Sequence, residues 1–189
     1  MTVRESLQRA IRPSTTRSTG ALWAKSLLNA VLFFGIFMLA LPWLAHRLLP
    51  LPLAIPTVCR TWLAGALVLV GIGMWAVCLD TFSRHGKGTP LPMDAPRELV
   101  TTGLFGIIRN PIMAGELLVI WGETLYVASL GVVFYAVLIT LGAHAAACYV
   151  EEPELRRRFG PAYDEYCARV PRWFPKVFGR RPRRIGDGR

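Results

Sequence analysis

The chain has 189 residues, of which 53% are hydrophobic and only 18% are charged. A water-soluble domain of this length carries more charge, so the composition favours residence in a membrane. The net charge of +10 comes mainly from the two ends of the chain, because eleven of the 22 Lys and Arg residues follow Tyr149 and five precede Leu27. Basic segments beside apolar spans attract anionic headgroups, so this charge indicates a membrane partner rather than a nucleic acid.

Cysteine and histidine give no sign of a metal site. The four cysteines form no CxxC pair and no metal-ligand spacing, and the three histidines are scattered. We therefore predict no metal, and we interpret the cysteines as packing residues or free thiols. The chain also has no long polar linker in which a domain boundary could lie, so we expect one domain over residues 1–189.

Apolar segments predict an all-α, polytopic integral membrane protein with four spans, at residues 22–45, 58–79, 112–127 and 130–150. A helix rises ~1.5 Å per residue, so the third segment is short for a hydrocarbon core of ~30 Å. We expect its start to lie inside the protein, shielded by its neighbours. Only two residues separate the last two segments, which predicts a tight antiparallel helical hairpin.

The connecting segments differ in their content of Lys and Arg. The N-terminus has five, the first connection two, the second connection four, the hairpin turn none and the tail eleven. Cytoplasmic segments are enriched in these residues. We therefore predict that both termini, the 81–111 loop and the 151–175 tail are cytoplasmic, in the inner membrane if the organism is a bacterium.

The tail has the pattern of an amphipathic helix. Its apolar residues recur every three or four positions, at Leu155, Phe159, Tyr163, Tyr166 and Val170. Gly160 and Pro161 interrupt the pattern, so we expect two short helices with a bend, lying against the cytoplasmic membrane face. The adjacent Glu151 and Glu152 could simply complement the positive end of the first helix.

A few polar residues lie within the predicted spans. Glu116 and Glu123 are seven residues apart and so share one helix face. Carboxylates at membrane depth usually face a protein interior or a polar cavity. Together with His144 they are candidates to line a cavity for a substrate, although hydrogen bonds to neighbouring spans would also explain them. In the loop before the third span, Asn110 suits a helix N-cap and Pro111 a first helical turn.

A resemblance to a known family is carried by three stretches: RELVTTGLFGIIRNPIMAG (97–115), EEPELRRRFGPAYDEY (151–166) and RVPRWFP (169–175). They resemble the isoprenylcysteine carboxyl methyltransferase family, and more broadly the membrane methyltransferases that include phospholipid N-methyltransferases. In that family these segments enclose S-adenosylmethionine. The resemblance implies cofactor contacts at Leu99, Val100, Phe105, Asn110, Pro111, Ile112, Met113, Glu151 and Glu152. A carboxylate would pair with the cationic cofactor, and Phe105 would offer a face to the adenine.

The family motif R-H-P-x-Y-x-G reads here Arg109-Asn110-Pro111-Ile112-Met113-Ala114-Gly115. Ala147 stands where the eukaryotic enzymes place an arginine that binds the prenylcysteine carboxylate. The residues implied to bind the cofactor therefore match the family better than those implied to bind the methyl acceptor. The expected function is methyl transfer from S-adenosylmethionine to a lipophilic or membrane-embedded carboxylate, amine or thiol, which needs no dedicated catalytic residue. The alternatives are a membrane reductase resembling sterol reductases and a non-enzymatic small transporter or lipid-binding protein.

Overall fold

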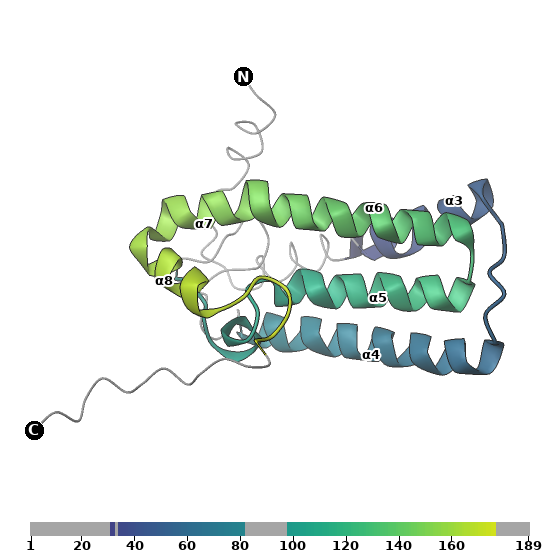
Figure 1. Cartoon of the computed structure of the whole chain (residues 1–189), viewed down its shortest axis with the longest axis horizontal. Coiled ribbons are helices and arrows are strands. Elements are labelled where there is room, and N and C mark those ends of the chain that lie inside the picture. The colour runs from purple at the N-terminus through teal and green to yellow at the C-terminus, as the bar shows by residue number, and fades with distance from the viewer. Residues whose placement is uncertain (1–30, 33, 82–97, 177–189) are drawn as a thin grey trace, which may run out of the picture.

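The computed structural model describes residues 31–32, 34–81 and 98–176. Every regular element in these ranges is helical, and no β-strand occurs among them. Figure 1 shows three long helices side by side: α4 (Thr57–Thr81), α5 (Pro111–Val127) and α6 (Leu130–Ala146), with α5 in the middle. The first part of the predicted span 22–45 and most of the 81–111 loop lie outside the described residues.

Two helical stretches are long and apolar enough to cross a membrane, namely Thr57–Thr81 and Leu130–Phe159. A shorter apolar stretch, Phe34–Leu48, consists of the π-helical turn η1 (Phe34–Ala40) and helix α3 (Leu41–Leu48). Large apolar side chains on α4 are open to the surroundings, including Trp62 at 79% exposure. Such surfaces are typical of a membrane interface. The all-helical prediction is confirmed for the described residues, whereas the four-span arrangement stays a prediction.

Helices α4 and α5 pack with their backbones in close contact. A Cβ atom at Gly71 would lie 2.5 Å from the carbonyl oxygen of Gly115, and one at Gly115 would lie 2.8 Å from the carbonyl oxygen of Gly71. Small residues that permit such contact are common between membrane helices. Helix α5 has only 17 residues, and this contact covers one side of it with the longer α4.

The connection between α3 and α4 is tied to the short turn between α5 and α6. Leu53 N–H donates to the carbonyl of Ala128 at 2.8 Å, and Leu130 N–H donates to the carbonyl of Leu51 at 2.9 Å. The Ser129 hydroxyl donates to the carbonyl of Leu49 at 3.1 Å. Ala128 has a φ of 49°, a left-handed conformation that lets the chain reverse within two residues. One end of the bundle is therefore fixed by main-chain hydrogen bonds.

At the opposite end, α6 continues through a π-helical turn, η5 (Ala147–Glu151), into α7 (Glu152–Phe159) and α8 (Pro161–Arg169). The two helices meet at Gly160, whose φ of 54° suits glycine, so the predicted bend is confirmed. The predicted apolar stripe is also confirmed. Its five residues form one cluster, in which Tyr163, Tyr166 and Val170 are buried and Leu155 and Phe159 pack against them.

Candidate functional site

Elements from distant parts of the sequence meet at the end of the bundle that carries α7 and α8. They are the short 3-10 helix η4 (Gly103–Gly106), the first turn of α5, and residues 170–176, which we call the C-terminal strap (Figure 1). Arg109 N–H donates to the carbonyl of Pro171 at 2.8 Å, and Asn110 N–H donates to the carbonyl of Arg172 at 3.3 Å. The strap is thus bound to the residues that directly precede α5.

Glu152 lies at the centre of a buried ionic network. Arg172 binds its carboxylate with two hydrogen bonds, Nε to Oε1 at 2.5 Å and Nη2 to Oε2 at 2.9 Å. Arg109 Nη1 lies 3.3 Å from Oε1, and its side chain is only 12% exposed. The hydrogen bond to Glu152 raises the pKa of Arg172 above its usual range. Glu152 therefore joins α7 to the strap and to the loop before α5, and its charge is neutralised inside the protein.

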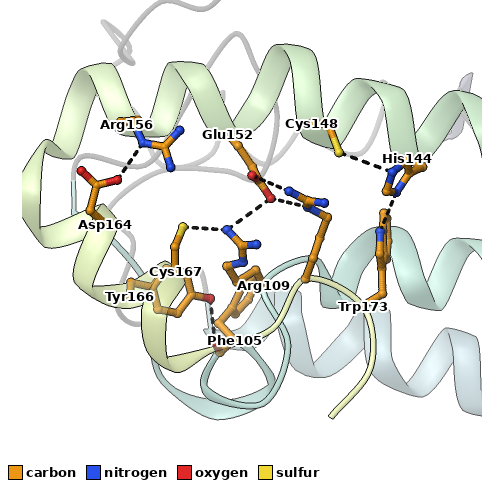
Figure 2. A network of polar contacts seen from close by, with 11 residues as sticks. Phe105, Arg109, His144, Cys148, Glu152, Arg156, Asp164, Tyr166, Cys167 and Trp173 are labelled. Atoms are coloured by element: carbon orange, nitrogen blue, oxygen red, sulfur yellow. Dashed lines mark hydrogen bonds and ion pairs between the residues drawn. The ribbon is translucent and has the colours of Figure 1, made fainter. Parts of the chain in front are cut away.

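Arg109 also contacts the thiol of α8. Its Nη1 donates to Cys167 Sγ at 2.6 Å, and Figure 2 shows the guanidinium between Cys167 and Glu152. The Tyr166 hydroxyl donates to the carbonyl of Phe105 at 2.6 Å, and burial raises the pKa of Tyr166, which keeps this donor protonated. Helix α8 is thereby attached to η4 and to the loop before α5.

Glu151 differs from its neighbour. Its side chain is partly buried, yet that side chain forms no hydrogen bond or ion pair within the described part of the chain. It interacts electrostatically with two other carboxylates, Glu116 of α5 and Glu152. An enclosed carboxylate without a cationic partner is costly. Of the acidic doublet, Glu151 is therefore the carboxylate whose charge no cationic residue of the described ranges neutralises.

Asn110 directly precedes α5, but its side chain makes no capping hydrogen bond. Asn110 does occupy the predicted N-cap position of α5, and its main-chain N–H donates to the strap. Its Nδ2 is buried and has no hydrogen-bond partner among the described residues. A buried amide donor without a partner costs free energy comparable to a lost hydrogen bond. Asn110 thus offers a free donor at the same end of the bundle as Glu151.

The other residues predicted to contact a cofactor also lie at this end of the molecule. Val100 and Phe105 are buried in a cluster with Cys78, and Ile112 packs against that cluster. Leu99 packs against the tyrosine cluster of α8. Pro111 is fully buried and begins α5, whereas Met113 in the same turn is partly buried. These side chains form an apolar wall around the start of α5.

The three polar residues proposed to line one cavity are separated by the structure. Glu116 lines a cavity of about 240 Å³ between α4, α5 and Phe34. Glu123 lies in a different groove, of about 650 Å³, which is also lined by His46. His144 is exposed on α6, and its Nδ1 accepts a hydrogen bond from Trp173 Nε1 at 3.0 Å (Figure 2). The prediction is thus wrong in placing them together.

Sequence analysis missed the roles of Arg109 and Arg172. A buried carboxylate needs a cationic or hydrogen-bonding partner, and both arginines lie within the stretches that carry the family resemblance. The sequence could therefore have indicated that an arginine pairs with the acidic doublet. It could not have indicated which of the two carboxylates the arginines bind. No group of three or more potential metal ligands occurs among the described residues.

The described structure thus combines apolar helices with a buried polar network at one end of the bundle. Residues 59–162 match the family model described as phospholipid methyltransferase, and the chain belongs to that family. The predicted resemblance to membrane methyltransferases is confirmed. The matched range covers all of α4 except its first two residues, together with α5, α6 and α7, and so contains Asn110, Glu151 and Glu152.

Two curated proteins are similar to this chain. Methanethiol S-methyltransferase 2 from Bradyrhizobium diazoefficiens is 29% identical over 196 residues, which is 88% of this chain and 71% of that protein. Nickel-cobalt-cadmium resistance protein NccN from Alcaligenes xylosoxydans xylosoxydans is 29% identical over 117 residues, which is 62% of this chain. The match covers only 54% of NccN.

Proposed function

We propose that this protein transfers a methyl group from S-adenosylmethionine to a lipophilic acceptor that reaches the site from the bilayer. The main support for the proposal is that the two carboxylates of the acidic doublet have different partners. Glu152 is neutralised by Arg109 and Arg172, whereas Glu151 has no such partner in the described structure. An enclosed carboxylate at this position suits a positively charged ligand.

The residues at this end of the bundle fit the chemistry of the cofactor. When bound, S-adenosylmethionine supplies a methyl group attached to a positively charged sulfur. Glu151 would bind its positive charge, and the Asn110 amide would donate to one of its polar groups. The first turn of a helix has N–H groups without intrahelical partners, and Ile112 and Met113 provide them here. Leu99, Val100 and Phe105 would exclude water from the cofactor, which strengthens these interactions.

We propose a four-span arrangement in which both termini, the 81–111 loop and the 151–175 tail are cytoplasmic. The distribution of Lys and Arg supports this orientation, and the two apolar helices support residence in the membrane. The whole chain would then act as one membrane methyltransferase domain. The cofactor would enter from the cytoplasm, and the acceptor would enter sideways from the lipid.

For the acceptor we propose a small thiol. The relative named methanethiol S-methyltransferase 2 suggests this chemistry, and the cavity beside Glu116 has a volume of about 240 Å³, which suits a small molecule. Ala147 is completely buried and carries no charge, so it offers nothing to bind the carboxylate of a prenylcysteine. A small uncharged acceptor agrees best with these features.

Calorimetric titration of the detergent-purified protein tests the cofactor. S-adenosylmethionine and S-adenosylhomocysteine should bind, and NADPH should not. Glu151→Gln should weaken binding of S-adenosylmethionine about 10- to 150-fold, because a hydrogen bond to a charged group contributes about 1.5–3 kcal/mol. Glu165→Gln, at an exposed carboxylate of α8, is the matched control. Unchanged affinity in the folded Glu151→Gln protein would contradict the proposed role of Glu151, and binding of NADPH alone would indicate a reductase.

A further inference from the structure

The C-terminal strap has a further attachment, at helix α6. Trp173 follows Arg172 in the strap, and its indole Nε1 donates to His144 Nδ1 at 3.0 Å (Figure 2). The two rings also lie against each other, with their centroids 6.2 Å apart and their planes inclined by 35°. His144 therefore ties the strap to α6, in addition to the bonds that the strap forms with α7 and with the loop before α5.

The hydrogen bond between Trp173 and His144 requires a neutral imidazole. An indole N–H can only donate, so His144 Nδ1 accepts and carries no proton. The proton of the neutral ring then lies on Nε2, which faces Cys148 Sγ at 3.6 Å. An imidazolium carries a proton on both nitrogens and accepts no hydrogen bond. Protonation of His144 would therefore set two N–H groups against each other and break its hydrogen bond with Trp173.

Two groups contact the His144 ring in the described part of the chain, the Cys148 thiol and the indole of Trp173. No carboxylate in these ranges forms a hydrogen bond or ion pair with the ring. The acidic doublet follows His144 by about two helical turns, and its Glu152 is bound to Arg172, the charged residue next to Trp173. Histidine is the side chain that normally changes charge between about pH 5 and pH 8.

The strap connects the two sides of the proposed cofactor site. On one side, Asn110 N–H donates to the carbonyl of Arg172 at 3.3 Å. On the other side, the Arg172 guanidinium binds Glu152, the neighbour of Glu151. Asn110 and Glu151 are the residues proposed to bind the cofactor, so a ligand held between them would be bordered by the strap.

We propose that His144 is a positioning residue that controls release of S-adenosylhomocysteine through the strap, an inference that rests on the proposed function. Neutral His144 holds Trp173 and keeps the strap against α6, so that the ligand is retained. Protonated His144 releases Trp173, and the ligand then dissociates faster. The strap remains bound through Arg172, so protonation loosens it without detaching it.

Four variants test this role in the full chain. His144→Asn keeps an acceptor that does not titrate, because the side-chain oxygen of asparagine is as many bonds from the backbone as imidazole Nδ1. His144→Leu removes the acceptor, and Trp173→Phe removes the donor. The matched control is His46→Asn, because His46 belongs to α3 at the opposite end of the bundle (Figure 1).

The first measurement needs no cofactor. The protein is labelled with ¹⁵N and purified in detergent, and the indole N–H signal of Trp173 is assigned by its loss in Trp173→Phe. This signal should shift between about pH 5 and pH 8 in the wild type and in His46→Asn. It should stay constant in His144→Asn and His144→Leu, because neither side chain titrates.

The second measurement follows the loss of labelled S-adenosylhomocysteine from preloaded protein after excess unlabelled compound is added. One hydrogen bond corresponds to a factor of about 2 to 10, so the wild type and His46→Asn should lose the ligand about 2- to 10-fold faster at about pH 5.5 than at about pH 8. His144→Asn should be slow at both pH values, whereas His144→Leu and Trp173→Phe should be fast at both. A merely structural role would not produce these differences in pH dependence.

Several results would overturn the inference. A Trp173 signal that does not shift with pH in the wild type would show that His144 does not control the strap. A pH dependence of release that persists in His144→Asn would assign it to another group, and the comparison of this variant with the wild type decides the matter even if His144→Leu does not fold. A wild type that binds no S-adenosylhomocysteine would refute the proposed function itself, whereas the indole signal would still show whether His144 holds Trp173.

Discussion

The buried network at Glu152 leads to a quantitative prediction for Glu152→Gln. The change keeps the size of the side chain and removes its charge. It leaves Arg109, whose side chain is 12% exposed, and Arg172, whose side chain is 30% exposed, facing a neutral amide. Removing one partner of a buried ion pair costs about 3–5 kcal/mol. Arg172 can recover part of its hydration, so we expect a loss near the lower value, about 3 kcal/mol of the free energy of unfolding.

A loss of that size is measurable by thermal unfolding of the purified protein in detergent, followed by circular dichroism. For a chain of 150–250 residues, 1 kcal/mol shifts Tm by about 2–4 °C, so Glu152→Gln should lower Tm by about 6–12 °C. The control is Arg156→Gln, which breaks the Arg156–Asp164 pair, whose side chains are 52% and 56% exposed. Exposed pairs contribute little, so this variant should unfold close to the wild-type temperature.

The combination of results distinguishes the two carboxylates of the doublet. Glu152→Gln should lose stability, whereas Glu151→Gln, which removes an enclosed charge without a cationic partner, should unfold at the wild-type temperature or above it and lose cofactor affinity. A Glu152→Gln protein that unfolds at the wild-type temperature and fails to bind S-adenosylmethionine would refute this reasoning. Such a result would indicate that the Glu152 carboxylate binds the cofactor rather than the two arginines.

Two further predictions concern packing and hydrogen bonding. Gly71→Ala should destabilise the protein by about 1–3 kcal/mol, because the new Cβ would lie 2.5 Å from the carbonyl oxygen of Gly115. The control is Gly73→Ala, which should not destabilise the protein, because its Cβ would have no atom within 4 Å. Equal unfolding temperatures for both variants would contradict the close packing of α4 and α5. Tyr166→Phe should lower the free energy of unfolding by about 1–3 kcal/mol, because it leaves the carbonyl of Phe105 without its hydroxyl donor. Denaturant unfolding measures this loss. An unchanged midpoint would show that the hydrogen bond contributes nothing to stability.

Features that depend on neighbouring residues in the chain were predictable from the sequence. The apolar segments 58–79 and 130–150 fall on helical stretches because each is a continuous apolar run long enough to cross a membrane as a helix. The bend at Gly160 follows from a Gly-Pro pair. The apolar stripe of the tail has a spacing of three or four residues, which places its members on one side of two short helices.

Features that depend on distant residues were not predictable in this way. Nothing near Glu151 and Glu152 in the sequence indicates that one carboxylate binds two arginines while the other has no partner. Arg172 reaches Glu152 only because the chain reverses at Gly160. The side chain of Asn110 is likewise left without a partner because the strap, far along the chain, binds its backbone.

The C-terminal strap has a consequence for how the molecule assembles. It is held to Arg109 and Asn110 through the carbonyl oxygens of Pro171 and Arg172, so it can dock only after α5 and α6 have brought these distant parts of the chain together. Contacts between residues far apart in sequence form late, because the entropy of closing the intervening loop must be overcome first. One end of the bundle is therefore completed after the helices that it closes are in place. Incomplete chains would keep their apolar helices but lack the closed end.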